Sequence, residues 1–501
     1  MARLAGIDAA FLYLETPSAH MHVVGTIIVD PASGTTSSLA NPYAAIERTI
    51  AARLAAIPRM RRRVVEVPLG LEHPVWVDDP TFRIRNHIRR RTLRGSGSQR
   101  QLTDLVGKIA SRPLDRSRPL WELWSIRGLA GGRLALVVKV HHAAMDGTTG
   151  SDVLAQLLDL QPCEHPQRVP RAKPVAGGPL PSAAALVRSA VTSWSERPMK
   201  LARALGDTGL FAYRALFERE EGPAPTLPFT GPRTVFNEPI SSERAVAFGR
   251  VSLADIKALK RQLGMTVNDI VLAGCTMTLR HYLQEHGGVP ARPLVASIPV
   301  AVSHADQSDT VNRVSAMCVG LPVQIEDPVA QLHAVAADAA RGKQLQRAVG
   351  PSLVQRWAQV LPPGLVAQGA QLFWRYRLAG RMRPLHSLIV SNVPGPPLPL
   401  YAAGARVVEV YPLGPILEGA GMNVTVFSYE DSVHFGIITC RRAVPDPAPI
   451  ARGFEAAVAS LVQTAAPRRM RRRRQPRVPD LVAAAALSRG EASYARRSPR
   501  V

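Results

Sequence analysis

Val140-His-His-Ala-Ala-Met-Asp-Gly147 is the stretch from which both the fold and the chemistry of this chain can be inferred. It completes the run Leu134–Val140, whose β-branched residues predict a strand. Asp146-Gly147 then favours a turn, and the apolar spacing over Thr148–Leu160 predicts a helix. Since adjacent residues of a strand point to opposite faces, we expect only one of the two histidines to face a given cavity.

His141 and His142 indicate proton transfer. An imidazole with an ordinary pKa of about 6.5 can take a proton from a hydroxyl at neutral pH, which accelerates a reaction by roughly 10²- to 10⁴-fold. Asp146 can buttress the turn or orient a ring. The residues alone also allow two structural histidines or a metal site. Because a third ligand at recognised spacing is missing, no metal is predicted.

The chain has 501 residues, which exceeds one ordinary core, so we expect two domains with a linker and a tail. The predicted division is a domain over residues 1–160, a proline-rich crossover linker over 161–235, a second domain over 236–466 and a basic, disordered tail over 467–501. The linker contains one helical island, from Ala183 to Glu221.

The second half alternates strand and helix patterns. A strand is expected near Phe248, followed by a helix that begins with the capping-box-like Ser252-Leu-Ala-Asp255. A closing helix is expected after Asp446-Pro447. The other predicted strands are Leu294–Val302, Ser387–Val393, Met422–Tyr429 and His434–Cys440. Both halves therefore predict an α/β fold.

Composition limits the function classes. The four cysteines stand singly, which argues against zinc or a disulfide framework and favours a reducing cytoplasm. We expect no signal peptide and no transmembrane helix. The net charge of +24 suits nucleic acid, anionic lipid or coenzyme A. The arginine clusters lack interleaved aromatic residues, so nucleic acid is not predicted as a partner.

Three motifs resemble one known family. HHAAMDG, residues 141–147, resembles the HHxxxDG signature of coenzyme A-dependent acyltransferases. Arg118-Pro-Leu-Trp-Glu122 and Val267-Asn-Asp-Ile-Val-Leu-Ala273 are similar to the PLW and NDVVLA elements of bacterial wax ester synthase/diacylglycerol acyltransferases, among them the mycobacterial triacylglycerol synthases. Further similarities, which extend the resemblance over about residues 3 to 465, are Gly6–Leu12 with Glu15, Met21–Val23 and Ser391–Pro396.

This resemblance implies a fold of two chloramphenicol acetyltransferase-like domains with a channel between them. Acyl-CoA would enter the channel from one side and the acceptor alcohol from the other. On this chain His142 resembles the general base and His141 its supporting neighbour. Asp146 resembles a structural residue that holds the loop, and Gly147 a substrate-binding position.

Asn268 and Asp269 follow Thr266 at the start of a predicted helix, where capping and dipole complementarity explain them. The resemblance implies a second interpretation, in which both bind substrate and Asn268 lies near the developing oxyanion. One departure from the family pattern is Val311, which stands where the family commonly has glycine.

The function that the resemblance implies is transfer of a long-chain acyl group from acyl-CoA, a co-substrate, to diacylglycerol and to long-chain alcohols, without a tightly bound cofactor. We expect peripheral attachment to a membrane or lipid inclusion, through a helix over Gly364–Leu378 that inserts Phe373 and Trp374 or else faces the core. The alternatives are an HHxxxDG enzyme acting on a carrier-bound polyketide or another alcohol, and a catalytically weak lipid-surface protein.

Overall fold

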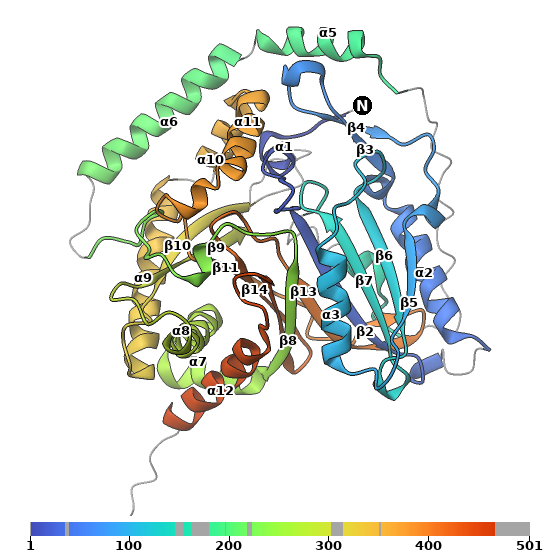
Figure 1. The fold of residues 1–501 in the computed structure, drawn as a ribbon, viewed down its shortest axis with the longest axis vertical. Coiled ribbons are helices and arrows are strands. Elements are labelled where there is room, and N and C mark those ends of the chain that lie inside the picture. Colours follow the sequence, from blue (N-terminus) through green and yellow to red (C-terminus); the bar gives the residue numbers. More distant parts are fainter. Residues whose placement is uncertain are drawn as a thin grey trace, which may run out of the picture. The chain divides into compact units, whose positions relative to one another are not determined.

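The fold is built around two six-stranded sheets (Figure 1). Met1–Val462 cluster as one compact unit, and a second unit begins at Gln463. None of the helices in the described part of the chain is both long and apolar enough to cross a membrane. The computed structural model describes residues 2–35, 40–145, 154–162, 180–195, 197–217, 223–301, 314–349 and 352–465.

The first sheet has the order β12-β13-β2-β7-β6-β5. Its central strand β7 is buried at all eight positions, which explains the continuous apolar run in the sequence. The strand predicted over Leu134–Val140 is confirmed and extends to His141. The strands of this sheet are β2 (His22–Asp30), β5 (Ile88–Thr92), β6 (Trp121–Arg127), β7 (Leu134–His141), β12 (Tyr401–Ala402) and β13 (Ala405–Leu413).

The second sheet has the order β10-β9-β11-β14-β15-β8, and β11 runs parallel to both of its neighbours. All strands predicted in the second half are found, with ends that differ by at most two residues, and this sheet also contains β10, which was not predicted. Its strands are β8 (Arg244–Ser252), β9 (Leu294–Ala301), β10 (Val314–Leu321), β11 (Leu388–Val393), β14 (Met422–Tyr429) and β15 (Ser432–Cys440). A small third sheet contains β1 (Ala2–Arg3), β3 (Arg62–Val65) and β4 (Val75–Asp78).

The pair β12-β13 comes from the second half of the sequence but completes the first sheet. Strand β13 is antiparallel to β2, with Arg406 opposite Asp30 at one end and Leu413 opposite Val24 at the other. The two sheets are therefore interlocked by the chain. The domain boundaries at residues 160 and 236 remain a proposal. Residues 401–413, which were assigned to the second domain, belong to the first sheet.

Helix α3 (Gln99–Ala110) stands between the two sheets (Figure 1). Its buried Val106 belongs to one apolar cluster with Ile28 of the first sheet and Phe248 of the second. A Cβ at Gly107 would lie 2.8 Å from the carbonyl oxygen of Arg244, so α3 approaches β8 closely. This shared core fixes one sheet against the other.

The predicted helix starts are confirmed where the structure describes them. Helix α7 (Leu253–Leu263) begins with Ser252, whose hydroxyl accepts the N–H of Asp255, and α12 is Ala448–Ala465. The helical island forms α5 (Ala183–Trp194) and α6 (Arg197–Phe217). The remaining helices of more than one turn are α1 (Gly6–Tyr13), α2 (Pro42–Ala56), α8 (Val267–Glu285), α9 (Pro328–Val349), α10 (Ser352–Val360) and α11 (Pro363–Arg375).

Candidate active site

His141 is the last residue of β7 and His142 directly follows it, and the two side chains have different environments. The backbone N–H of His141 donates to Leu120 at 3.0 Å, and that of His142 donates to Met21 at 2.8 Å. The side chain of His141 is 1% exposed, whereas His142 is half-buried. The expectation of two different roles is therefore consistent with the geometry. Asp146, Gly147, Val311 and the basic tail lie outside the described residues.

His141 is held through both ring nitrogens. Its Nδ1 accepts the backbone N–H of Ala143 at 3.1 Å, and its Nε2 lies 3.5 Å from a carboxylate oxygen of Glu15. Because Nδ1 accepts, the ring proton belongs on Nε2, where it faces Glu15. Burial lowers the pKa of His141 below its ordinary value even though Glu15 opposes the shift. The ring is therefore neutral at pH 7.

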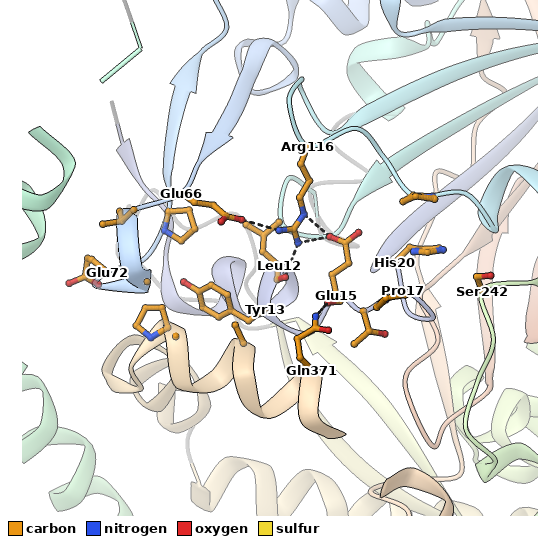
Figure 2. A pocket seen from close by; sticks show the side chains of 18 of the residues that line it. Leu12, Tyr13, Glu15, Pro17, His20, Glu66, Glu72, Arg116, Ser242 and Gln371 are labelled. Atoms are coloured by element: carbon orange, nitrogen blue, oxygen red, sulfur yellow. Dashed lines mark hydrogen bonds and ion pairs between the residues drawn. The ribbon is translucent and has the colours of Figure 1, made fainter. Parts of the chain in front are cut away.

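Glu15 remains ionised beside this ring. Burial alone would raise the pKa of Glu15, but His141 and Arg116 together bring it below its ordinary value. The guanidinium of Arg116 donates from Nε to Glu15 at 2.9 Å and also reaches Glu66 at 3.1 Å (Figure 2). Glu15 belongs to one of the family-like motifs, but no local pattern in the sequence indicates that it contacts His141.

Helix α1 and the residues directly after it contact both histidines. The ring of Phe11, on α1, stacks on His142 with centroids 4.0 Å apart and an interplanar angle of 17°. Glu15 follows α1 by two residues and contacts His141. A Cβ at Gly6 would lie 2.4 Å from the backbone of Ala358 on α10, so α1 is seated tightly. The aromatic contact restricts the orientation of His142.

A buried polar row continues on the same face of the first sheet. His22 on β2 is the register partner of His141, and their ring centroids lie 6.1 Å apart. Among the residues that the structure describes, none forms a hydrogen bond with either ring nitrogen of His22. Burial, followed by nearby Lys139, lowers the pKa of His22 well below the ordinary value. The ammonium of Lys139 donates to the carbonyls of Ile109 and Arg112 at 3.2 and 2.8 Å. The site is therefore polar behind His141.

A cavity of about 630 Å³ opens beside Glu15 (Figure 2). Neither His141 nor His142 lines it, so the cavity approaches the pair only through Glu15 and its neighbours. Helix α11 forms one wall, and the side-chain amide of Gln371 donates to the carbonyl of Glu15 at 3.1 Å. Other lining residues are Leu12, His20, Glu66, Glu72, Arg116 and Ser242.

The residues of the NDIVLA element are explained locally. The carboxylate of Asp269 accepts the N–H of Thr266 at 2.9 Å, and the N–H of Asp269 donates to the Thr266 hydroxyl at 3.2 Å. This reciprocal pair is a capping box at the start of α8, so the capping interpretation is confirmed for Asp269. Asn268 is half-buried, and its binding to substrate stays a prediction.

Trp121 of the PLW element has an architectural position. It is buried, its indole N–H donates to the carbonyl of Met60 at 2.7 Å, and its ring stacks on His87 at 4.5 Å. Trp121 therefore packs into the wall beside β7. Within the described residues, no group of three or more histidine, cysteine, aspartate or glutamate side chains is arranged to hold a metal ion.

Comparison with known proteins identifies the family. The catalytic-domain model of the wax ester synthase/diacylglycerol acyltransferase family matches residues 4–271, and the C-terminal-domain model of that family matches residues 310–461. Two Mycobacterium tuberculosis proteins, each named a "putative diacylglycerol O-acyltransferase", are 37% identical over 470 residues and 35% identical over 459 residues. The matched regions cover 92% and 91% of this chain and 90% and 94% of those proteins.

Solved structures agree with this assignment. The wax ester synthase/diacylglycerol acyltransferase from Marinobacter aquaeolei VT8 is 26% identical, with a TM-score of 0.67 over 93% of this chain and 100% of that one. The first condensation domain of the calcium-dependent antibiotic synthetase, 17% identical with a TM-score of 0.53 over 93% and 96%, shares the fold. The two-domain α/β fold that the resemblance implied is confirmed. The chain belongs to the wax ester synthase/diacylglycerol acyltransferase family.

Proposed function

We propose that this protein transfers a long-chain acyl group from acyl-CoA to the free hydroxyl of diacylglycerol, and also accepts long-chain alcohols. The names of the mycobacterial relatives support the choice of acceptor. The observation that carries the proposal is the difference between the two histidine environments at the end of β7. His141 is buried and lies beside Glu15, whereas His142 is half-buried and stacks on Phe11.

His142 acts as the general base in this proposal. Its imidazole takes the hydroxyl proton while the alcohol oxygen attacks the thioester carbonyl. The C–S bond then breaks, and the imidazolium returns the proton to the leaving thiolate, so that an ester and free coenzyme A are formed. Stacking on Phe11 limits the directions in which His142 can point, which favours a productive geometry.

His141 and Glu15 act as positioning residues. The ring of His141 accepts the N–H of Ala143, which is the first residue after the histidine pair. Glu15 keeps the proton of that ring on the opposite nitrogen. Together they hold the backbone that carries His142, and Asp146 and Gly147 are proposed to continue this support as structural and substrate-binding residues.

The test is acceptor-dependent release of thiol from palmitoyl-CoA, with dioleoylglycerol or hexadecanol as acceptor. We expect His142→Ala to lower the rate by about 10²-fold or more, since general-base help is worth roughly 10² to 10⁴. His281→Ala is the matched control, because His281 is an exposed histidine on α8. An unchanged rate in His142→Ala, or thiol release that needs no acceptor, would contradict the proposal.

A further inference from the structure

Helix α11 has two chemically different faces. Its inner face lines the cavity with Ala367 and Gln371, and the indole N–H of Trp374 donates to the hydroxyl of Ser18 at 3.0 Å. Its outer face carries Leu365 and Leu372, which are 66% and 50% exposed. These two leucines are seven residues apart and so lie on one side of the helix.

Two more positions extend this outer stripe of α11. A Cβ at Gly369 would meet no atom within 4 Å, so that position faces open space. Tyr376, directly after the helix, is also exposed. The indole N–H of Trp374 is hydrogen-bonded to Ser18, whereas Leu365 and Leu372 are exposed, so these leucines are the α11 side chains that face outward.

Leu69 stands next to the start of α11, at the mouth of the cavity. It is 91% exposed and has a φ of +59°, a left-handed conformation that is rare for leucine. The following residue, Gly70, lines the cavity, and a Cβ there would lie 3.2 Å from the Cα of Gly364. A strained and exposed leucine at the mouth of a cavity indicates that its side chain contacts a binding partner.

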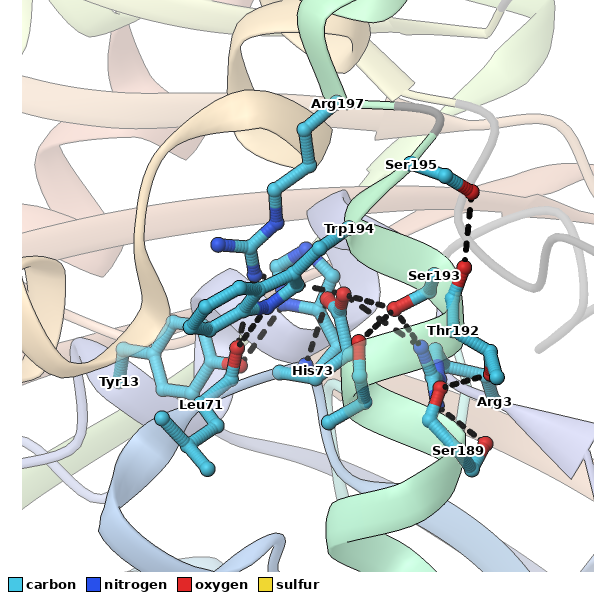
Figure 3. Close-up of polar contacts among 12 residues, drawn as sticks. Arg3, Tyr13, Leu71, His73, Ser189, Thr192, Ser193, Trp194, Ser195 and Arg197 are labelled. Atoms are coloured by element: carbon cyan, nitrogen blue, oxygen red, sulfur yellow. Dashed lines mark hydrogen bonds and ion pairs between the residues drawn. The ribbon is translucent and has the colours of Figure 1, made fainter.

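Helix α5 continues the apolar surface beyond this loop. Its Leu186 and Ala190 are buried against Val67 and Val75, whereas Val191 and Trp194 are exposed. The exposed Trp194 is fixed in place, because its indole N–H donates to the carbonyl of Leu71 at 3.3 Å and the guanidinium of Arg197 lies 5.2 Å from its ring (Figure 3). An aromatic ring under an arginine suits a membrane interface.

Helix α6 lies alongside α10 at the edge of the molecule (Figure 1) and buries very little. Of its side chains over residues 197–210, only Ala204 is fully buried. It is attached to α10 by a hydrogen bond from the indole N–H of Trp357 to Thr208 at 3.0 Å and by an ion pair between Asp207 and Arg356. Its exposed apolar side chains are Met199, Leu201, Leu205 and Leu210.

The charge of these four helices indicates which kind of partner their exposed face binds. Together α5, α6, α10 and α11 contain seven arginine or lysine residues and a single acidic residue, Asp207, which is paired. Exposed apolar side chains among basic residues are the pattern of helices that lie on anionic lipid. The cavity lining behind them carries three carboxylates and one guanidinium, which favours a neutral lipid over a phosphate-bearing one.

We propose that Leu69, Trp194, Leu365 and Leu372, with α6, form a docking face for an anionic phospholipid surface. The neutral acceptor lipid then passes from that surface between the loop Pro68–Gly70 and α11 into the cavity beside Glu15. The choice of acceptor rests on the proposed function, whereas the docking face rests on the exposure and charge of the helices alone.

The test is flotation of the full chain with vesicles of phosphatidylcholine, with and without phosphatidylglycerol. We expect the wild type to float with the anionic vesicles. Leu365→Asp/Leu372→Asp should bind them at least about tenfold more weakly, because two leucines that the lipid would cover are lost and two negative charges are added. Leu398→Asp is the matched control, since Leu398 is 54% exposed but lies outside the four helices, and it should bind like the wild type.

Equal flotation of the double variant and the wild type would overturn the docking face. The docking face would also be overturned if the wild type did not bind vesicles but formed a dimer in lipid-free buffer that the double variant did not form. The exposed face would then bind a second copy of the chain. Thiol release separates this proposal from the proposed function. The double variant should lose activity on diacylglycerol in vesicles and keep it on freely dissolved dihexanoylglycerol, whereas a wild type inactive on both would contradict only the transfer reaction.

Discussion

The end of β7 and the outer side of α11 break the usual distribution of polar and apolar residues in opposite directions. Next to His142, the side chains of His22, Lys139 and His141 are buried polar groups on one face of the first sheet. On α11, Leu365 and Leu372 are exposed apolar groups. Each arrangement costs stability if considered alone. Departures of this kind are common at functional sites, and we propose that the first serves the chemistry and the second the docking.

The largest contrast should come from two tryptophans, the buried Trp121 on β6, next to β7, and the exposed Trp194 on α5, in the proposed docking face. Trp121→Ala removes a buried ring and its hydrogen bond to Met60, and we expect it to lower the free energy of unfolding by about 3–5 kcal/mol. Trp194→Ala, on the exposed face, should lower it by less than about 1 kcal/mol. Denaturant unfolding of both variants measures the difference in the free energy of unfolding. Equal losses in the two variants would contradict the assignment of Trp121 to the core and of Trp194 to an exposed face.

The next effect concerns the carboxylate behind His141. Glu15→Ala removes the carboxylate that lies 3.5 Å from Nε2 of His141, and loss of this charged partner should lower kcat by roughly 10- to 100-fold with little change in KM. Glu66→Ala is the matched control, because Glu66 binds the same Arg116 but is exposed. Glu15→Asp should restore part of the rate. A positioning role is wrong if Glu15→Ala and Glu66→Ala lower kcat equally.

His22 makes the buried polar region sensitive to pH. Its pKa in the folded protein lies well below the ordinary 6.5, so below that pH the unfolded chain takes up a proton that the folded chain does not. Stability is therefore lost as the pH falls, by at most about 1.4 kcal/mol per pH unit from this residue. His22→Leu should flatten the pH dependence of the unfolding free energy below pH 6.5, whereas His281→Leu should not. Parallel curves for wild type and His22→Leu would show that His22 does not titrate in this way.

The smallest effect tests the openness of the docking face. Gly369→Ala adds a methyl group that meets no neighbour, so it should raise the free energy of unfolding by about 0.5–1 kcal/mol through helix propensity. Gly107→Ala, in contrast, places a Cβ 2.8 Å from the carbonyl of Arg244 and should destabilise the protein. Thermal or denaturant unfolding distinguishes the two, and destabilisation by Gly369→Ala would mean that α11 is covered at this position.

Local patterns in the sequence determined most of the secondary structure. The β-branched run before His141 became β7, Ser252 and Thr266 became helix caps, and the island after Ala183 became two helices. Periodicity and capping depend on residues within one or two turns of each other, so they can be read without knowledge of the fold. The alternation of a strand likewise predicted that the two histidines differ.

The tertiary structure alone decided how distant segments meet. It placed Glu15 beside His141, inserted β12-β13 into the first sheet, and turned Trp374 toward Ser18 rather than outward. None of these contacts has a periodic signature, because each joins residues more than a hundred positions apart. The sequence by itself therefore determined the elements and the family motif, and only the packing of the two sheets and of α11 decided which carboxylate supports the histidines and which side chains face outward.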